Sequence, residues 1–332
     1  MKKYIRQFAT FLKRKFKNSR LAKGSFVQAG VFFLKSWWHF ILLGLAFVVC
    51  LYYPLGAFFI HHIDRNPNYE IVPVHEKRLA SIDTLAMLID REVNVHLWTA
   101  NLPFFFPSYF LDNMPNFQLG LMKANEVVAL NLSKQMNATE SSELSEAADL
   151  LTYPGDIWLF RSDSNLIPAP SSARQYRKAR QHLLTYNEQL ENGIVSFVPS
   201  EISLAPVLEA VAKSLEVSDA QLEVQIREYS GDFWDGKADD VFFYNQGKAY
   251  GYLILLRAIG NDYRKIIVEN EVYEKWTRLL SALEQAVAIQ PVIIRNADLS
   301  DVMASNHLSY LAFYILKARS LIVDIVRHFE VR

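Results

Sequence analysis

The feature that most constrains this chain is an uncharged stretch of 21 residues, Phe40 to Ile60. At about 1.5 Å of rise per residue, a helix of this length spans roughly 32 Å, which is enough to cross the hydrocarbon core of a bilayer. Thirteen of its residues are Leu, Ile, Val or Phe, and each contributes about −0.3 to −0.6 kcal/mol to membrane insertion. We therefore predict a transmembrane anchor over residues 37–62.

The distribution of charge predicts the orientation of this anchor. Ten Lys or Arg residues and no Asp or Glu precede Asp64, and the rest of the chain carries ten more acidic than basic residues. Because positive flanks stay in the cytoplasm, we expect a bacterial inner-membrane protein with a cytoplasmic N-terminus and a periplasmic domain. The apolar stretch exceeds that of a signal peptide, so we expect it to remain uncleaved.

The cytoplasmic segment 1–36 is basic and amphipathic. Apolar residues from Tyr4 to Phe16 gather on one side of a helical projection, opposite most of the basic ones. Such a helix binds anionic lipid surfaces, although a passive orientation signal remains an alternative. No nucleic-acid-binding module accompanies it, so no nucleic-acid partner is expected. The candidate membrane-surface residues are Lys13, Arg14, Lys17, Arg20, Trp37 and Trp38.

Residues 63–74 form a short polar linker, and residues 75–332 are predicted to form a mainly α periplasmic domain. Apolar residues recur at spacings of three and four, as in helices with one buried face. Short apolar pieces near 157–160, 194–198 and 292–294 are either strands or buried connectors. Prolines at 168 and 170 mark an internal boundary near 166–172, so two packed halves are possible. The predicted helices cover 79–93, 117–136, 142–152, 172–191, 204–215, 237–259, 267–289 and 298–328.

The sequence contains near matches to familiar catalytic and metal-binding motifs but no complete motif. Gly231 to Ala238 resembles a phosphate-binding loop, but Ala238 stands where a magnesium-binding hydroxyl is required. Asp232, Asp235, Asp239 and Asp240 offer oxygen ligands for calcium without EF-hand spacing, and they equally suit a helix N-terminus. The histidines form no zinc pattern, and the only cysteine, Cys50, lies inside the predicted anchor. We expect no metal and no cofactor.

An unusual aromatic segment runs from Asn101 to Gly120. It contains three prolines, which prevent one continuous helix. We expect it to wrap through the core, with an aromatic surface that touches the bilayer or a partner as the alternative. Candidate polar or partner-binding residues here are Asn101, Phe105, Asp112, Asn113, Asn116 and Gln118.

A second unusual stretch is Ser305 to Leu308, a polar interruption inside the predicted C-terminal helix, whose surface is otherwise apolar and aromatic. Buried Asn306 and His307 would need hydrogen-bond partners, so they either tie this helix to another element or line a functional pocket.

Four stretches carry a resemblance to a known family: Asn101 to Phe106, Leu111 to Gly120, Tyr244 to Tyr252 and Asn306 to Leu308. From about Trp38 to the C-terminus, the chain resembles the bacterial family called domain of unknown function 2333. The resemblance implies a bacterial inner-membrane protein and brings no established reaction or catalytic residues.

Tethering, a large helical surface and the lack of catalytic spacing favour a cell-envelope binding or scaffolding protein over an enzyme. Its expected partners are the lipid bilayer and another envelope protein or lipid. The alternative is a tethered enzyme acting on lipid or peptidoglycan precursors. A deep cavity joining Asp112 to His307 would favour the enzyme, whereas an exposed apolar groove would favour the binding protein.

Overall fold

The structure is a computed structural model, and it describes residues 22–69, 77–136, 142–159, 168–231, 235–298 and 305–331. Side chains are described from Trp38 onward within these ranges. Lys13, Arg14, Lys17 and Arg20 lie outside the described residues, and of Trp37 only the backbone is described. The first 56 residues form one compact unit, and Ala57–Arg332 form a second.

Helix α2, Ala22–Ile60, contains residues 37–60 of the predicted anchor, and the last two predicted residues, His61 and His62, follow the end of the helix. Its Trp38–Ile60 portion is the one helical segment among the described residues that is long and apolar enough to cross a membrane. Leu43 and Phe47 are 72% and 64% exposed, as expected of side chains that face lipid. Trp38, at the first residue of this portion, is 56% exposed.

The mainly α fold is confirmed, and the described residues contain no strand. The described residues of the three short apolar pieces, 157–159, 194–198 and 292–294, are connectors between helices, and an isolated bridge joins Asn296 to Asn306. The helices after α2 are α3 Ala80–Asp90, α4 Asn113–Gln135, α5 Glu143–Leu151, α6 Ser172–Glu191, α7 Glu201–Tyr229, α8 Ala238–Asp262, α9 Arg264–Glu269, α10 Tyr273–Ala288 and α11 His307–Val331.

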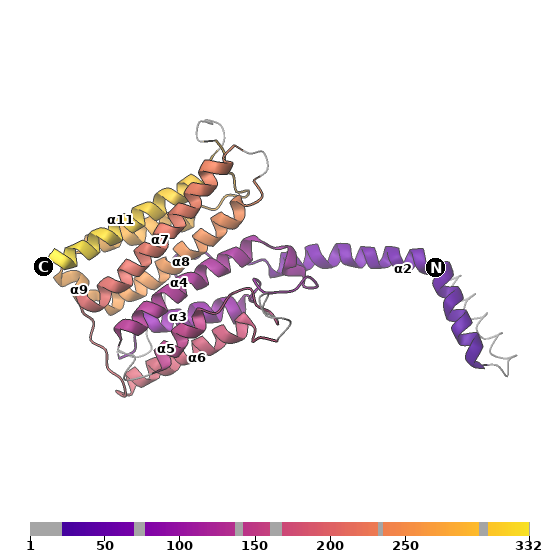
Figure 1. Ribbon diagram of the computed structural model, residues 1–332, viewed down its shortest axis with the longest axis horizontal. Helices are drawn as coiled ribbons and strands as arrows, with labels where there is room; N and C mark the ends of the chain where they lie inside the picture. Colours follow the sequence, from indigo (N-terminus) through magenta and orange to yellow (C-terminus); the bar gives the residue numbers. More distant parts are fainter. Residues whose placement is uncertain are drawn as a thin grey trace. The chain divides into compact units, whose positions relative to one another are not determined.

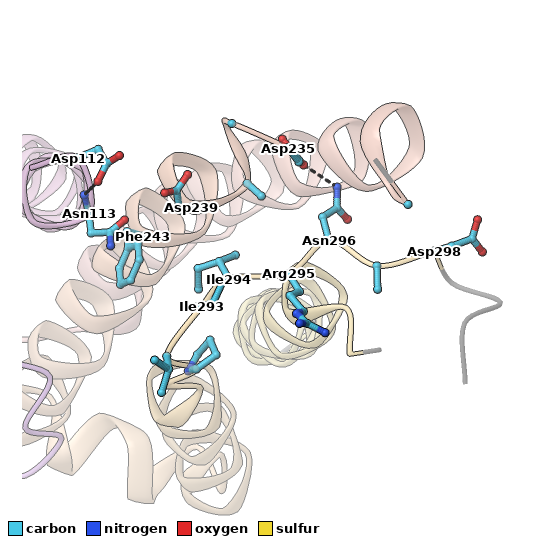
Figure 2. A pocket seen from close by; sticks show the side chains of 16 residues that line it. Asp112, Asn113, Asp235, Asp239, Phe243, Ile293, Ile294, Arg295, Asn296 and Asp298 are labelled. Atoms are coloured by element: carbon cyan, nitrogen blue, oxygen red, sulfur yellow. Dashed lines mark hydrogen bonds between the residues drawn. The ribbon is translucent and has the colours of Figure 1, made fainter. Parts of the chain in front are cut away.

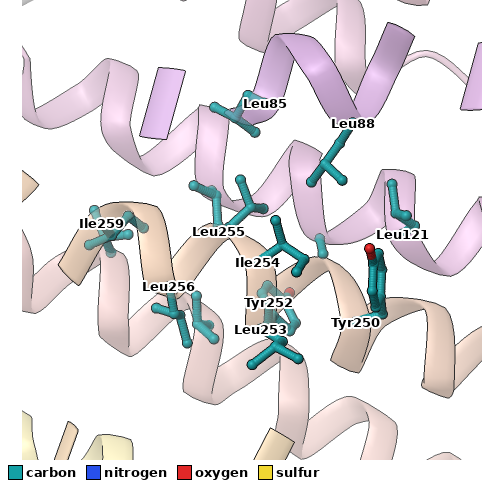
Figure 3. Packing of buried hydrophobic residues seen from close by; sticks show 14 of the residues in the cluster. Leu85, Leu88, Leu121, Tyr250, Tyr252, Leu253, Ile254, Leu255, Leu256 and Ile259 are labelled. Atoms are coloured by element: carbon teal, nitrogen blue, oxygen red, sulfur yellow. The ribbon is translucent and has the colours of Figure 1, made fainter. Parts of the chain in front are cut away.

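The second unit consists of two groups of helices that meet along α4 and α8 (Figure 1). Helices α3, α4, α5 and α6 pack together, and α7, α8, α10 and α11 form the other group. Leu85 and Leu88 of α3 and Leu121 of α4 lie against the apolar face of α8 (Figure 3). Burial of this continuous core is the main source of the stability of the domain.

Helices α4 and α8 approach each other at backbone distance. A Cβ atom on Gly247 would lie 2.1 Å from the Phe117 carbonyl oxygen, and one on Gly120 would lie 1.9 Å from that of Tyr244. Glycine is the only residue that fits such close approaches. The central contact of the fold therefore depends on residues without side chains.

Several helix ends differ from the sequence prediction. Helix α7 continues to Tyr229, past the predicted end at 215, and within it the Ser218 hydroxyl donates to the Ser214 carbonyl at 3.3 Å. The predicted helix 267–289 is broken at Glu271, where φ is 56°. Helix α11 begins at His307 instead of near 298, because the Asn306 side chain accepts from the Ser309 amide at its first turn.

Candidate functional site

A cleft of the second unit lies where α4 and α8 begin, beside the connector between α10 and α11 (Figure 2). Its volume is 960 Å³, which is within the range of small-ligand pockets. The lining combines carboxylates with apolar side chains, and Val292 and Ile293 are 101% and 69% exposed. The described lining residues are Asp112, Asn113, Gly231, Asp235, Gly236, Ala238, Asp239, Phe243, Pro291, Val292, Ile293, Ile294, Arg295, Asn296, Ala297 and Asp298.

The connector that forms one wall is held by a chain of buried amides. Asn296 Nδ2 donates to the Gln225 carbonyl at 2.9 Å and to Asp235 Oδ2 at 3.0 Å. Asn306 Nδ2 donates to Asn296 Oδ1 at 2.8 Å and to the Ala297 carbonyl at 2.7 Å. Asn306 thus ties the start of α11 to the cleft wall and satisfies its own buried polar atoms.

His307 lies behind the connector and does not line the cleft. Its backbone N–H donates to the Arg295 carbonyl, and its Nδ1 accepts from the Arg295 N–H, both at 2.9 Å. Burial and the charge of Arg295 lower the pKa of His307, which favours the neutral ring that this acceptor role requires. The described lining of this cleft therefore includes Asp112 and not His307.

Asp112 and Asn116 fix the start of α4 against α8. The Asp112 carboxylate accepts from the Asn113 N–H at 2.8 Å and caps the helix. Asn116 Nδ2 donates to the Asp112 carbonyl at 3.0 Å and to Asp240 Oδ1 at 2.5 Å. Burial, followed by the nearby charges of Asp239 and Asp112, raises the pKa of Asp240.

An apolar groove of 650 Å³ lies beside this contact, between α7 and α8. Val217 and Val224 of α7 are half-exposed along it. Its remaining lining residues are Asn116, Ala220, Gln221, Asp240, Val241, Tyr244 and Asn245. Asn116 lines this groove, whereas Asp112 and Asn113 line the cleft.

Gln118 and Asn101 belong to other parts of the domain. Buried Gln118 accepts from the Thr99 N–H at 2.9 Å and donates to Glu92 Oε2 at 3.2 Å. Asn101 Nδ2 donates to the Ile157 carbonyl at 2.8 Å and anchors the start of the aromatic segment. Neither residue lines the cleft.

The expectation that the aromatic segment wraps through the core is wrong for most of its rings. Phe104 and Phe110 are each 68% exposed, and Phe105 is 46% exposed with its ring centroid 5.5 Å from that of Trp158. The short 3₁₀ helix Pro107–Phe110 turns the chain just before α4. Its prolines and its position at a helix end leave the rings outside the bundle.

Sequence reasoning missed a buried ion pair at the end of α3. Arg91 and Glu92 are 5% and 1% exposed, with Arg91 Nε 2.8 Å from Glu92 Oε1. Burial alone would raise the pKa of Glu92, but nearby His96 and Arg91 more than offset it and lower the pKa. A single turn of π-helix, Arg91–Val95, carries the pair. The sequence offered one sign of this pair, because Arg91 and Glu92 are adjacent opposite charges near the end of the apolar helical repeat 79–93.

The segment between the candidate span and residue 69 is fixed to the domain by this cluster. Tyr250 accepts from Arg91 Nη1 at 2.7 Å and donates to the Asn66 carbonyl at 3.1 Å. Arg65 Nη1 donates to Gln246 Oε1 at 3.1 Å. Arg257 donates to the Pro67 carbonyl. The first part of the predicted linker therefore lies against α8.

Within the described residues, no group of three His, Cys, Asp or Glu side chains is arranged to hold a metal ion. Asp232, one of the four carboxylates considered as calcium ligands, lies outside the described residues. Asp235 accepts hydrogen bonds from Gln225 Nε2 at 2.8 Å and from the Lys237 N–H at 3.1 Å.

Comparison with protein families gives one match, over residues 100–216 and 207–330. The matched region contains α4 to α11, the cleft, the groove and the aromatic segment. Comparisons with curated proteins and with solved structures give no match. The chain belongs to the family described as an uncharacterized protein conserved in bacteria, domain of unknown function 2333.

Proposed function

We propose that this chain is a membrane-anchored binding or scaffolding protein of the bacterial cell envelope, which holds a segment of another envelope protein in the cleft. The observation that carries the proposal is the exposure of Val292 and Ile293 beside an open cleft of 960 Å³. Neighbouring apolar side chains exposed at a cleft are typical of protein interaction sites. The proposal places the chain in the inner membrane with its helical domain in the periplasm, supported by the basic N-terminal side of the candidate span.

The polar groups of the cleft also support binding over chemistry. Asp112 caps α4, Asp235 holds Gln225 and Asn296, and Asp239 accepts from the Asp240 N–H at 3.1 Å. A general base must reach the proton that it removes. These carboxylates instead position backbone and amide groups of the protein itself.

In-cell photo-crosslinking tests the proposal. A photo-reactive residue at Val292 should give a specific adduct with an envelope protein, and one at Val198, which is 82% exposed in the connector before α7, should not. Val292→Ser with Ile293→Ser should remove binding of that protein and complementation of a deletion strain without lowering thermal stability. A folded double variant that still complements would contradict the proposal.

A tethered enzyme acting on lipid or peptidoglycan precursors is the second candidate. Its support is that burial, followed by the charge of Asp112, raises the pKa of Asp239 in the cleft. Asp239→Asn with Asp112→Asn preserves the size of both side chains and the capping of α4 while removing two titratable groups of the cleft. The binding protein should tolerate this double change and complement the deletion. A folded variant that keeps its partner but fails to complement would favour the enzyme.

A further inference from the structure

The domain carries an exposed aromatic surface, here called the aromatic lip, separate from the cleft and the groove. Trp158, in the loop after α5, is 40% exposed and joins the lip through its ring contact with Phe105. Tyr109 is 54% exposed. The lip consists of Phe104, Phe105, Tyr109, Phe110 and Trp158.

The chain leaves the candidate span beside the same end of the domain. The His62 N–H donates to Met114 Sδ at 3.3 Å, in the first turn of α4. The rings of His62 and His96 are 4.5 Å apart. Ala57–Ile60, the last turn of the candidate span, belongs to the same compact unit as these residues.

Chain geometry limits how far the lip lies from the end of the span. His62 follows Ile60 by two residues, which is at most about 7 Å of extended chain. Phe110 precedes Met114 by four residues, at most about 14 Å. Residues 61–69 do not act as a free spacer, because the Asn66 carbonyl accepts from Tyr250 and Arg65 donates to Gln246. Phe110, at the end of the lip, is therefore joined to the end of the span by a short path through Met114 and His62.

We propose that the aromatic lip inserts into the interfacial region of the same bilayer and docks the helical domain on the membrane surface. This inference rests on the anchor in the proposed function and deepens it by naming lipid as a partner. Aromatic side chains favour the headgroup region. Residues 98–122 contain no Lys or Arg, so docking depends on aromatic burial and not on anionic lipid. It therefore needs only zwitterionic lipid and is insensitive to salt.

Depth-dependent fluorescence quenching tests this docking with the full chain in phosphatidylcholine nanodiscs. In a Cys50→Ala background, an environment-sensitive dye is attached at Tyr109→Cys and, in a separate protein, at Val198→Cys. Val198 lies beside Phe197, whose ring is 6.0 Å from that of Tyr263 at the far end of α8. A third protein carries the dye on native Cys50, inside the candidate span.

Acyl-chain quenchers should quench the dye at positions 50 and 109 but not at 198, at both low and high salt. Quenching at 50 without quenching at 109 would overturn the docking while leaving the anchor in place. A lack of quenching at 50 would overturn both. Phe104→Ser with Phe110→Ser should reduce quenching at 109 to the level at 198, without lowering the thermal unfolding temperature. Full quenching in this variant would overturn the role of the rings.

Discussion

Lys248 gives the sharpest test of the packing between α4, α7 and α8. Its side chain is buried, at 2% exposure, and its ammonium donates to the Ser214 carbonyl at 2.9 Å. Burial, with a smaller effect from Lys123, lowers the pKa of Lys248 from 10.5 to about 8. At about 1.4 kcal/mol per pH unit, the buried charge costs roughly 3 kcal/mol at neutral pH.

The sign of the pH dependence follows from this lowered pKa. Below pH 8 the amine is charged in both the folded and the unfolded chain, so the cost is present in full. Between pH 8 and 10.5 the unfolded chain binds more protons, and the free energy of unfolding rises with pH. Above this range the cost is gone.

Lys248→Met should remove the cost and lose a hydrogen bond that contributes about 1 kcal/mol. We expect a net stabilisation of roughly 1–2 kcal/mol at pH 7 and a weaker rise in stability between pH 8 and 10. Denaturant unfolding of the full chain in detergent, followed by circular dichroism, measures both. Lys265→Met is the control, since its side chain is 82% exposed. A destabilised variant with an unchanged pH profile would refute the reasoning.

Two further changes test other parts of the fold. Gly247→Ala should lower the free energy of unfolding by about 1–3 kcal/mol, because the added Cβ would overlap the Phe117 carbonyl. Gly236→Ala is the control and should be neutral, because the space around its Cβ is open. Equal stability of the two variants would contradict the backbone contact. Arg91→Met should cost about 3–5 kcal/mol by leaving Glu92 buried without its partner, and adding Glu92→Gln should recover most of it. Because the pKa of Glu92 is lowered from 4.5, the stability that its charge contributes should be present above that pH and lost as the pH falls below it. Acid unfolding that is unchanged by Glu92→Gln would contradict a stabilising ion pair at Glu92.

Helical periodicity located most helices, but their ends were predicted less well. The prediction for α6, 172–191, matches the structure at both ends, and Ser171 caps it through the Arg174 N–H. The prediction placed the start of α4 at 117, but the helix begins at Asn113. Pro115 does not delay it, because the first turn of a helix has no internal partner for an N–H.

The candidate site was predictable only in part, because its contacts join distant parts of the chain. Asp112 and Asn113 do line the cleft, and Asn306 holds its wall through Asn296. No local pattern indicates that Asn296 meets Gln225, or that Tyr250 holds Asn66. The aromatic segment was placed in the core because phenylalanine is usually buried, and periodicity cannot reveal that prolines leave its rings outside.

Membrane topology tests the central claim most directly. With Cys50→Ala in place, a single cysteine at Val198, on the helical domain, should react with a membrane-impermeant maleimide in intact cells whose outer membrane has been made permeable. A cysteine at Ser19, before the candidate span, should react only after the inner membrane is disrupted. Protection at 198 with labelling at 19 would place the helical domain in the cytoplasm and contradict the account of a periplasmic binding protein.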